Sequence, residues 1–176
     1  MGKLSPAQLL VDHRDLFRNC TGAVLDLACG EGHNGILLAL QGCDVVLADR
    51  SEEALQKART LAAELKASVT YWQVDLEQEE ENPLQGKSYG GILVFRYLHR
   101  PLIPSVREAL APGGVLLYET YTLEQARFGK PRNPDFLLKP GELERLFGDW
   151  DVIHYHEGIY KNPDRAVAGI VCKKPF

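Results

Sequence analysis

The sequence predicts an α/β fold built on a mostly parallel sheet, and two observations carry this prediction. Short apolar segments alternate along the chain with longer amphipathic segments, as expected where strands and covering helices follow one another. The first short segment, residues 23–28, is apolar at nearly every position, which is typical of a parallel strand buried on both faces. A length of 176 residues suits one domain, so we expect a single domain over residues 1–176.

The first element is expected to be an amphipathic helix over residues 5–19, within a leading segment 1–20. Ser5 is its cap candidate and Pro6 lies in its first turn. Ser51 is the expected cap of a later helix, and the acidic residues after it favour a helix start. Strands are expected at 23–28, 44–48, 69–74, 91–95, 115–120, 150–156 and 166–172, further helices at 36–40, 51–66, 104–110 and 141–147, and a helix stop at 112–114.

Composition and charge exclude several classes of protein. With 20 Lys and Arg against 24 Asp and Glu, the net charge is −4, which argues against a broad basic face for nucleic acid. No apolar run reaches the roughly 18 residues of a membrane span, and the start shows no signal-peptide pattern, so we expect a cytoplasmic protein. The four scattered cysteines predict reduced thiols and no metal. The expected partner is a small molecule, and the expected assembly is a monomer or a homodimer.

A glycine-rich turn follows the first predicted strand. Gly30, Gly32 and Gly35 spell G-x-G-x-x-G, a spacing that lets the backbone turn sharply and approach a ligand at a helix start. Asp49 ends the second predicted strand, 19 residues after Gly30, where a carboxylate can accept hydrogen bonds from ribose hydroxyls. Taken alone, this pattern fits a dinucleotide site, so an NAD-dependent reductase stays as one alternative.

Three details favour a different ligand. Asp26 lies inside the first strand, where its carboxylate suits a positive group such as an amino-acid ammonium and would repel a pyrophosphate. Asp75 ends the third strand, where it can accept from an adenine amino group, with Leu76 against the ring. From the length of 176 residues, we also expect no separate substrate domain.

These motifs resemble those of the class I S-adenosylmethionine-dependent methyltransferases. The first motif is Asp26-x-Ala28-Cys29-Gly30-x-Gly32, the second is Asp49, the third is 74–76, and 90–95 and 110–115 resemble the fourth strand and the step before the fifth. The resemblance implies a Rossmann-like, seven-stranded, mostly parallel sheet with helices on both faces and an antiparallel last strand. It implies S-adenosylmethionine as cofactor and S-adenosylhomocysteine as product, held by Asp26, Ala28, Gly30, Gly32, Asn34, Asp49, Arg50, Asp75, Leu76 and Phe95.

Residues 96–101 follow the fourth strand, and side chains beyond strand carboxyl ends face the ligand in open α/β sheets. The segment lacks the Asn/Asp-Pro-Pro-aromatic tetrad of methyltransferases that act on nucleic-acid or amide amines. Arg96 and His99 suit an anionic or oxyanionic acceptor instead. For Arg100, a helix-capping or ion-pairing role is as good an interpretation.

Residues 122–140 hold three prolines and four basic residues, which predicts a substrate lid. Near the end of the fifth strand, Glu119 or Tyr121 is expected to face the pocket, because successive side chains of a strand alternate sides. The acceptor-side candidates are therefore Arg96, His99, Tyr121, Arg127 and Arg132. His154 and His156 face one side of a strand, but without further ligands at a suitable spacing we assign no metal to them.

Within the superfamily, residues 139–143, 150–152 and 155–157 resemble the tellurite-resistance-type methyltransferases. That group is associated with tellurium and selenium oxyanions. Its His-Arg pair before the last strand is absent from the turn 161–165, so we predict only a small, anionic acceptor, either a metalloid oxyanion or a small metabolite. A domain that binds S-adenosylmethionine without catalysis is the second alternative.

Overall fold

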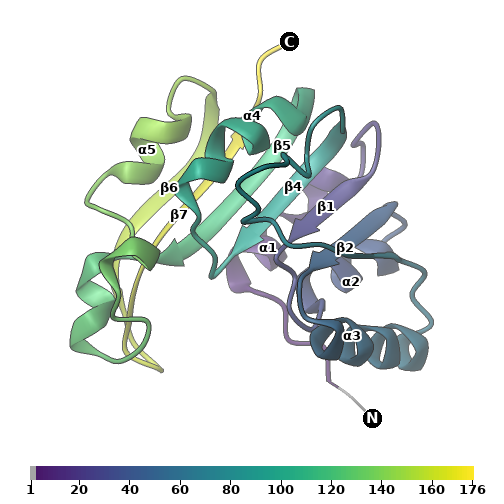
Figure 1. Ribbon diagram of the computed structural model, residues 1–176, viewed down its shortest axis with the longest axis horizontal. Coiled ribbons are helices and arrows are strands. Elements are labelled where there is room, and N and C mark those ends of the chain that lie inside the picture. Colours follow the sequence, from purple (N-terminus) through teal and green to yellow (C-terminus); the bar gives the residue numbers. More distant parts are fainter. Residues whose placement is uncertain (1–2) are drawn as a thin grey trace.

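The computed structural model describes residues 3–176 and contains one seven-stranded sheet with helices on both faces (Figure 1). Residues 1 and 2, which the predicted leading segment includes, lie outside this range. The strands are β1 (Val24–Leu27), β2 (Val45–Asp49), β3 (Thr70–Gln73), β4 (Tyr89–Phe95), β5 (Leu110–Tyr121), β6 (Asp151–Tyr160) and β7 (Arg165–Lys173). The α-helices are α1 (Gln8–His13), α2 (His33–Leu40), α3 (Glu52–Leu65), α4 (Ile103–Ala109) and α5 (Glu142–Phe147), and the 3₁₀ helices are η1 (Arg14–Phe17), η2 (Arg100–Leu102), η3 (Leu123–Arg127) and η4 (Pro134–Phe136).

The strand order in the sheet is β3-β2-β1-β4-β5-β7-β6. Strands β1 to β5 run parallel to one another, so their carboxyl ends meet at one edge of the sheet. Strand β7 lies between β5 and β6 and is antiparallel to both. The predicted seven-stranded, mostly parallel sheet with an antiparallel last strand is therefore confirmed.

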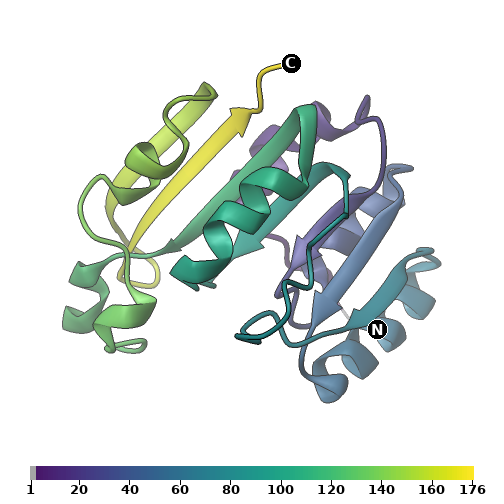
Figure 2. The ribbon, with the colours of Figure 1, turned by 45° about the horizontal axis from the view of Figure 1, so that its top comes forward.

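Helices α1, α2 and α3 cover one face of the sheet, whereas α4 and α5 cover the other (Figures 1 and 2). Each face has its own apolar cluster, and β1 contributes to both because successive side chains of a strand point to opposite faces. Leu25 and Leu27 belong to the cluster beneath α4 and α5, and Val24 belongs to the other. Within residues 3–176, no helix is long and apolar enough to cross a membrane.

The leading helix is shorter than predicted. Helix α1 begins after Ala7, and η1 replaces its second half. Ser5 does not cap it, because Ala7 occupies the N-cap position. The Ser5 amide donates to Nδ1 of His33 at 3.0 Å, which ties the segment to the start of α2. Helix α2 begins three residues earlier than predicted, because Gly32 adopts a left-handed conformation (φ +81°) that starts the helix at His33.

The predicted helix stop at residues 112–114 lies inside β5 rather than before it. Strand β5 already pairs with β4 at Leu110, opposite Tyr89, and the register then shifts. Regular pairing resumes at Val115, opposite Gly91. The two glycines of the stop therefore form an irregular stretch within the strand.

The expected cap of the third α-helix is confirmed. The hydroxyl oxygen of Ser51 accepts a hydrogen bond from the amide of Ala54 at 3.1 Å, and Glu52 and Glu53 lie in the first turn of α3. This cap follows directly after Asp49, so it also fixes where β2 ends at the ligand edge of the sheet.

Candidate functional site

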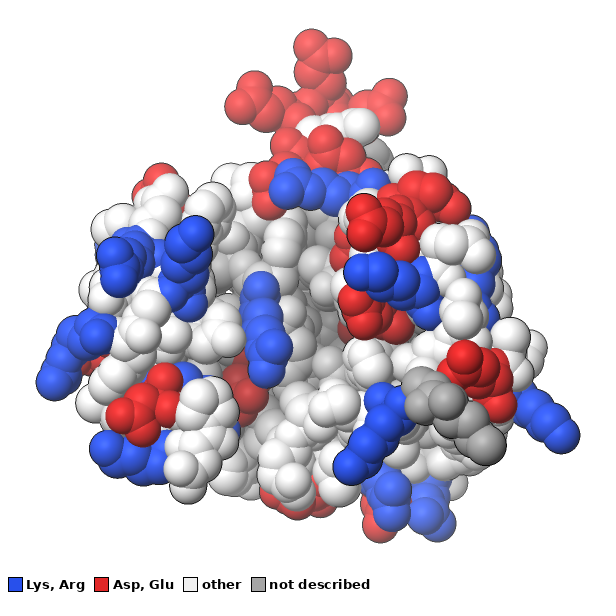
Figure 3. All heavy atoms as spheres, turned by 90° about the horizontal axis from the view of Figure 1, so that it is seen from below, with Lys and Arg blue, Asp and Glu red and all other residues white. Residues whose placement is uncertain are grey.

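A cavity of about 1660 Å³ opens along the carboxyl edge of the parallel strands. Figure 3 shows this edge as a hollow in the surface, with acidic side chains along its upper right rim and basic ones along its left rim. The walls come from α1, the turn after β1, the ends of β2 to β5, the segment 122–140 and the hairpin of β6 and β7. Sites for one small ligand commonly occupy about 300–1,000 Å³, so this cavity has room for two ligands side by side.

Asp26 lies at the floor of the cavity with 2% of its surface exposed. Its Oδ2 accepts a hydrogen bond from the Gly35 amide at 2.8 Å. Burial raises the pKa of this carboxyl to about 7; the Gly35 hydrogen bond lowers it and the Asp49 charge raises it further. Asp26 therefore changes charge near neutral pH, at a position where a cationic group of a ligand would favour the ionised form.

Asp49 is fixed by two backbone hydrogen bonds. Its Oδ2 accepts from the Gly30 amide at 2.8 Å and its Oδ1 accepts from the Ser51 amide at 2.9 Å. The carboxylates of Asp49 and Asp26 thus accept hydrogen bonds from two amides of the glycine motif, those of Gly30 and Gly35. A dinucleotide site uses the amides of such a turn to hold a pyrophosphate, and here carboxylates occupy them. This arrangement disfavours the alternative of an NAD site.

The glycines of the turn allow close packing as well as sharp bends. A Cβ atom on Gly35 would lie 2.4 Å from Cδ2 of Leu47 and 3.0 Å from Oδ2 of Asp26. A Cβ atom on Gly32 would lie 2.9 Å from Cδ1 of Leu47. Gly32 is not among the residues that line the cavity, so its role in the structure is to seat α2 against β2.

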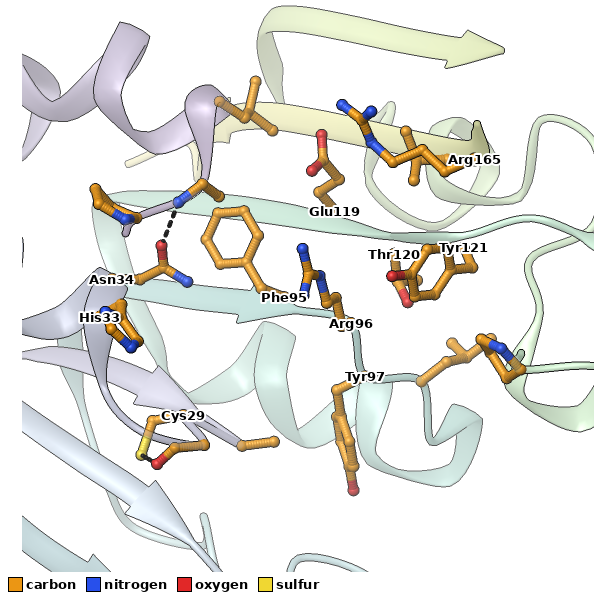
Figure 4. A pocket seen from close by; sticks show the side chains of 18 of the residues that line it. Cys29, His33, Asn34, Phe95, Arg96, Tyr97, Glu119, Thr120, Tyr121 and Arg165 are labelled. Atoms are coloured by element: carbon orange, nitrogen blue, oxygen red, sulfur yellow. Dashed lines mark hydrogen bonds between the residues drawn. The ribbon is translucent and has the colours of Figure 1, made fainter. Parts of the chain in front are cut away.

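The other predicted cofactor residues lie around the same half of the cavity, namely Ala28, Gly30, Asn34, Arg50, Asp75, Leu76 and Phe95. Asp75 accepts a hydrogen bond at Oδ1 from the Glu77 amide at 3.0 Å, and Leu76 is buried beside it. Asn34 accepts a hydrogen bond at Oδ1 from the Ala7 amide at 2.8 Å, which links the turn to the segment before α1 (Figure 4).

The opposite half of the cavity begins at the end of β4. Arg96 adopts a left-handed backbone conformation (φ +53°), which is uncommon for a residue other than glycine and is often found at functional sites. Its amide donates to the carbonyl oxygen of Glu119 at 2.9 Å. Figure 4 shows Arg96 among side chains from β4, β5 and β7, with Tyr121 and Arg165 on the same side of the cavity.

Three predicted acceptor residues do not line the cavity: His99, Arg127 and Arg132. Arg127 forms a 2.7 Å ion pair with Glu124 at the surface, where the two side chains are 64% and 58% exposed. Arg132 is exposed as well. Arg127 is the last residue of the 3₁₀ helix η3. The segment 122–140 presents Gln125, Phe128, Lys130 and Phe136 to the cavity instead.

Arg100 forms an ion pair, which was one of the two roles considered for it from the sequence. Its guanidinium contacts both carboxylate oxygens of Glu142, at 2.7 and 2.9 Å, and donates to the carbonyl oxygens of Asp135 and Leu137. These bonds hold η4 against the start of α5. Burial alone would raise the pKa of the Glu142 carboxyl, but the guanidinium of Arg100 and the hydrogen bond from the Lys139 amide together hold it below its usual value.

The structure also brings together a group of side chains that the sequence did not connect. Nε2 of His156 lies 2.9 Å from Oε2 of Glu119, and Nδ1 of His156 lies 3.0 Å from Nε2 of His154. The ring of His13 lies 5.1 Å from that of His154, centre to centre. Within residues 3–176, no group of three or more His, Cys, Asp or Glu side chains is arranged to hold a metal ion. The alternation of His154 and His156 was visible in the sequence, but their partners were not.

A family model described as a methyltransferase domain matches residues 24–114, which is just over half of the chain. The chain belongs to this family. The predicted resemblance to class I S-adenosylmethionine-dependent methyltransferases is thereby confirmed. The predicted likeness to the tellurite-resistance-like group agrees with the similarity to TehB reported below.

Of three relatives that the chain matches, two are named as methyltransferases. Hemagglutinin 1 of Eikenella corrodens is 27% identical over 139 residues, which cover 77% of this chain and 46% of that protein. The probable S-adenosyl-L-methionine-dependent methyltransferase TehB of Haemophilus influenzae is 26% identical over 160 residues, covering 85% and 52%. The ubiquinone biosynthesis O-methyltransferase of Aliivibrio fischeri is 36% identical over 103 residues, covering 55% and 43%. The chain thus spans about half the length of the curated relatives it matches.

The fold has a solved counterpart. The crystal structure of TehB from Haemophilus influenzae superposes on this chain with a TM-score of 0.78 at 20% identity, covering 98% of this chain and 63% of that one. The superposition includes the antiparallel β6–β7 hairpin, which lies beyond the matched range of the family model.

Proposed function

We propose that this chain binds S-adenosylmethionine in one half of the cavity and catalyses methyl transfer to a small anionic acceptor in the other half. The observation that carries the proposal is the division of charge within the cavity. Carboxylates of Asp26, Asp49 and Asp75 gather at the ends of β1 to β3. Basic groups gather at the end of β4, at the start of β7 and on the segment 122–140.

The acidic half fits the donor-rich groups of S-adenosylmethionine. Asp26 would accept from the ammonium group, Asp49 from the ribose hydroxyls and Asp75 from the adenine amino group, with Leu76 against the ring. When bound, the cofactor supplies a methyl group carried on a positively charged sulfonium, and the sulfur becomes neutral when the methyl group is transferred. The three carboxylates are held by backbone amides or by burial, so the chain can orient the donor without rearranging.

The basic half favours a small acceptor with an anionic group. The guanidinium groups of Arg96 and Arg165 can bind carboxylate or oxyanion oxygens in pairs, and Lys130 adds a third positive charge. Phe128 and Phe136 give the same half apolar walls. We therefore propose either a metalloid oxyanion or a small metabolite that carries an acidic group.

Methyl transfer from a sulfonium is an in-line displacement, and its main requirement is alignment of the nucleophile with the methyl group. Holding two reactants in this geometry can lower the barrier by about 7–11 kcal/mol. Arg96 follows Phe95 at the boundary between the two halves, so its guanidinium can fix the acceptor close to the donor.

The first test is calorimetric titration of the purified chain with S-adenosylhomocysteine, with NAD(H) and NADP(H) as controls. We expect micromolar binding of S-adenosylhomocysteine and none of the dinucleotides. A screen for release of S-adenosylhomocysteine from S-adenosylmethionine, with small carboxylates and oxyanions as acceptors, then tests catalysis. Binding of dinucleotides alone would contradict the donor assignment, and cofactor binding without turnover on any acceptor would support a non-catalytic domain.

A further inference from the structure

A connected row of ionisable side chains crosses the cavity wall, and the donor and acceptor assignments use none of it. Glu119 on β5 contacts His156 on β6 at 2.9 Å, and His156 contacts His154 at 3.0 Å. All three side chains line the cavity, and His13 from α1 borders His154. The row therefore joins the end of β5 to the outer strand of the sheet across the strand between them.

Gly169 explains how this contact forms. In the sheet, Gly169 on β7 is the register partner of both Glu119 on β5 and His156 on β6. A Cβ atom at Gly169 would lie 2.3 Å from Cε1 of His156 and 2.9 Å from its Nε2. Because the intervening strand has no side chain at this position, the imidazole can lie over it and reach the carboxylate.

The hydrogen bonds fix where the protons lie in the neutral row. The carboxylate of Glu119 accepts from Nε2 of His156, so this nitrogen carries the proton. Nδ1 of a neutral His156 is then an acceptor, and Nε2 of His154 must donate to it. This leaves Nδ1 of His154 as a bare nitrogen, without a hydrogen-bond partner in the part of the chain that the structure describes.

We propose that His154 is the general base of the methyl transfer, and that His156 and Glu119 are positioning residues that carry away the charge it acquires. This inference rests on the proposed function and adds to it a requirement on the acceptor. The nucleophile must carry a proton at neutral pH, as a hydroxyl or a thiol does, in addition to the anionic group that the basic half binds.

The proposed step balances in atoms and charge. The bond between the acceptor atom and its proton breaks, and an N–H bond forms at Nδ1 of His154. The proton on Nε2 of His154 moves to Nδ1 of His156, which becomes an imidazolium beside the carboxylate of Glu119. The electron pair of the broken acceptor–proton bond stays on the acceptor atom, which forms a bond to the methyl carbon. The electron pair of the broken carbon–sulfur bond stays on sulfur.

The surroundings of His154 keep it neutral and able to accept a proton. Burial lowers the pKa of the His154 imidazole, the nearby His156 and His13 rings lower it further, and the carboxylates of Asp12 and Glu119 oppose this effect. The titratable and charged side chains that face the row are Asp12 and His13 from α1, Glu119 from β5, Tyr160 from β6 and Arg165 from β7.

The first experiment measures the proton positions directly in the chain without an acceptor. Nitrogen NMR of ¹⁵N-labelled imidazoles at pH 8 should show His154 protonated at Nε2 and bare at Nδ1. In Gly169→Ala the added methyl group displaces the His156 ring, so the tautomer ratio of His154 should fall from full protonation at Nε2 toward the mixture of a free imidazole, in which Nε2 protonation is only the major form. Gly158→Ala is the control, because its added Cβ atom meets nothing within 4 Å in the same hairpin.

Protonation of His154 at Nδ1 in the unaltered chain would overturn the proposal. An unchanged tautomer ratio in a folded Gly169→Ala variant would also overturn it. Where Gly169→Ala does not fold, Glu119→Leu removes the carboxylate at the far end of the row and should give the same shift of the ratio toward that of a free imidazole.

The second experiment measures turnover with two acceptor probes, 3,4-dihydroxybenzoate and selenite. We expect His154→Gln to lower kcat with the hydroxylated probe by about 100-fold, in the usual range for loss of a general base. Its residual rate should rise tenfold per pH unit, while the unaltered chain keeps a plateau through neutral pH. Tyr155→Phe is the matched control, because it lies between the two histidines on the same strand and belongs to the other face of the sheet.

Equal kcat values in His154→Gln and the unaltered chain would refute the proposal. Turnover of selenite and not of the hydroxylated probe would also refute it, because a selenium lone pair needs no base. Titration of the unaltered chain and of His154→Gln with S-adenosylhomocysteine separates this proposal from the proposed function. If the unaltered chain does not bind S-adenosylhomocysteine, the proposed function is refuted. The tautomer and the pH profile test the row of side chains alone.

Discussion

The two halves of the cavity are built in different ways. In the half that we assign to the donor, backbone amides hold the carboxylates, and each contact joins residues close in sequence, nine apart for Asp26 and Gly35 and 19 for Asp49 and Gly30. In the half that we assign to the acceptor, side chains from separate strands meet, as Glu119 and His156 do across β7. A site held by backbone amides stays the same as long as the fold is kept. A site formed by side chains can accept a different substrate after substitution of a few residues.

The two halves also differ in their electrostatic cost. The donor half keeps a fully buried carboxyl, Asp26, whose burial opposes its ionisation at neutral pH. The acceptor half places its basic groups at the cavity surface, where solvent reduces the cost of their charge. Substitutions in the donor half should therefore have the larger effects on both binding and stability.

The largest effect on binding is expected from Asp26→Asn. The amide oxygen still accepts from Gly35, but the charge that would bind the ammonium group is lost. A hydrogen bond to a charged group contributes about 1.5–3 kcal/mol, so the Kd of S-adenosylhomocysteine should rise by about 10- to 100-fold. Calorimetry measures this change, and an unaltered Kd would show that Asp26 does not contact the ammonium group.

The same variant tests the sign of the linkage between ionisation and folding. The pKa of Asp26 is raised to about 7 in the folded chain, so its contribution to stability is fully present below about pH 4 and is lost as the pH rises through 7. Asp26→Asn does not ionise, so its stability relative to the unaltered chain should increase between pH 4 and pH 8. Urea unfolding at both pH values measures this, and a relative decrease would contradict the assigned direction.

Gly35→Ala is expected to destabilise the donor half next most strongly. Its Cβ atom would overlap the buried side chain of Leu47 and approach the carboxylate of Asp26. Overpacking of this kind costs about 1–3 kcal/mol in free energy of unfolding, measured by urea titration. Gly158→Ala serves as the comparison variant, since open space surrounds that position, and equal losses in the two variants would argue against tight packing at Gly35.

A smaller and more selective effect is expected from Arg96→Gln in the acceptor half. Loss of the guanidinium should raise the KM for an anionic acceptor by about tenfold, the equivalent of 1.4 kcal/mol, and leave the Kd of S-adenosylhomocysteine within about twofold. Steady-state kinetics and calorimetry on one preparation separate the two constants. Parallel loss of both would mean that the two halves are not distinct sites.

The smallest effect is expected from Arg127→Ala. Its guanidinium pairs with Glu124 at the surface, and exposed pairs of this kind contribute about 0–1 kcal/mol. Turnover and stability should therefore stay close to those of the unaltered chain. A large loss of turnover would place this side chain at the acceptor after all.

The contrast between the halves also explains what the sequence could predict. Asp26, Gly30 and Asp49 stand at fixed spacings around one strand–turn–helix unit, so local reasoning placed them in one site. Ser51 was predictable for the same reason, because capping depends on neighbours three residues away. The fold class followed from the alternation of apolar segments, which is also a local pattern.

The acceptor half was less predictable, because its contacts depend on orientation and on pairing between distant strands. Charge alone suggested Arg127 and Arg132, but the 3₁₀ turn that points Arg127 outward leaves no clear pattern in the sequence. Likewise, a single glycine in an apolar strand gives no sign that Gly169 lies between Glu119 and His156. That relation depends on the strand order, in which β7 is inserted between β5 and β6.

Helix α1 touches both halves at once. The segment before it is tied to the glycine turn through Ala7 and Asn34, and its last residue, His13, packs against His154 on the far side of the cavity. A displacement of this short helix by one ligand would therefore reach the half of the cavity that holds the other ligand. Thermodynamic reciprocity requires that, if one ligand changes the affinity of the other in this way, the second changes the affinity of the first by the same factor.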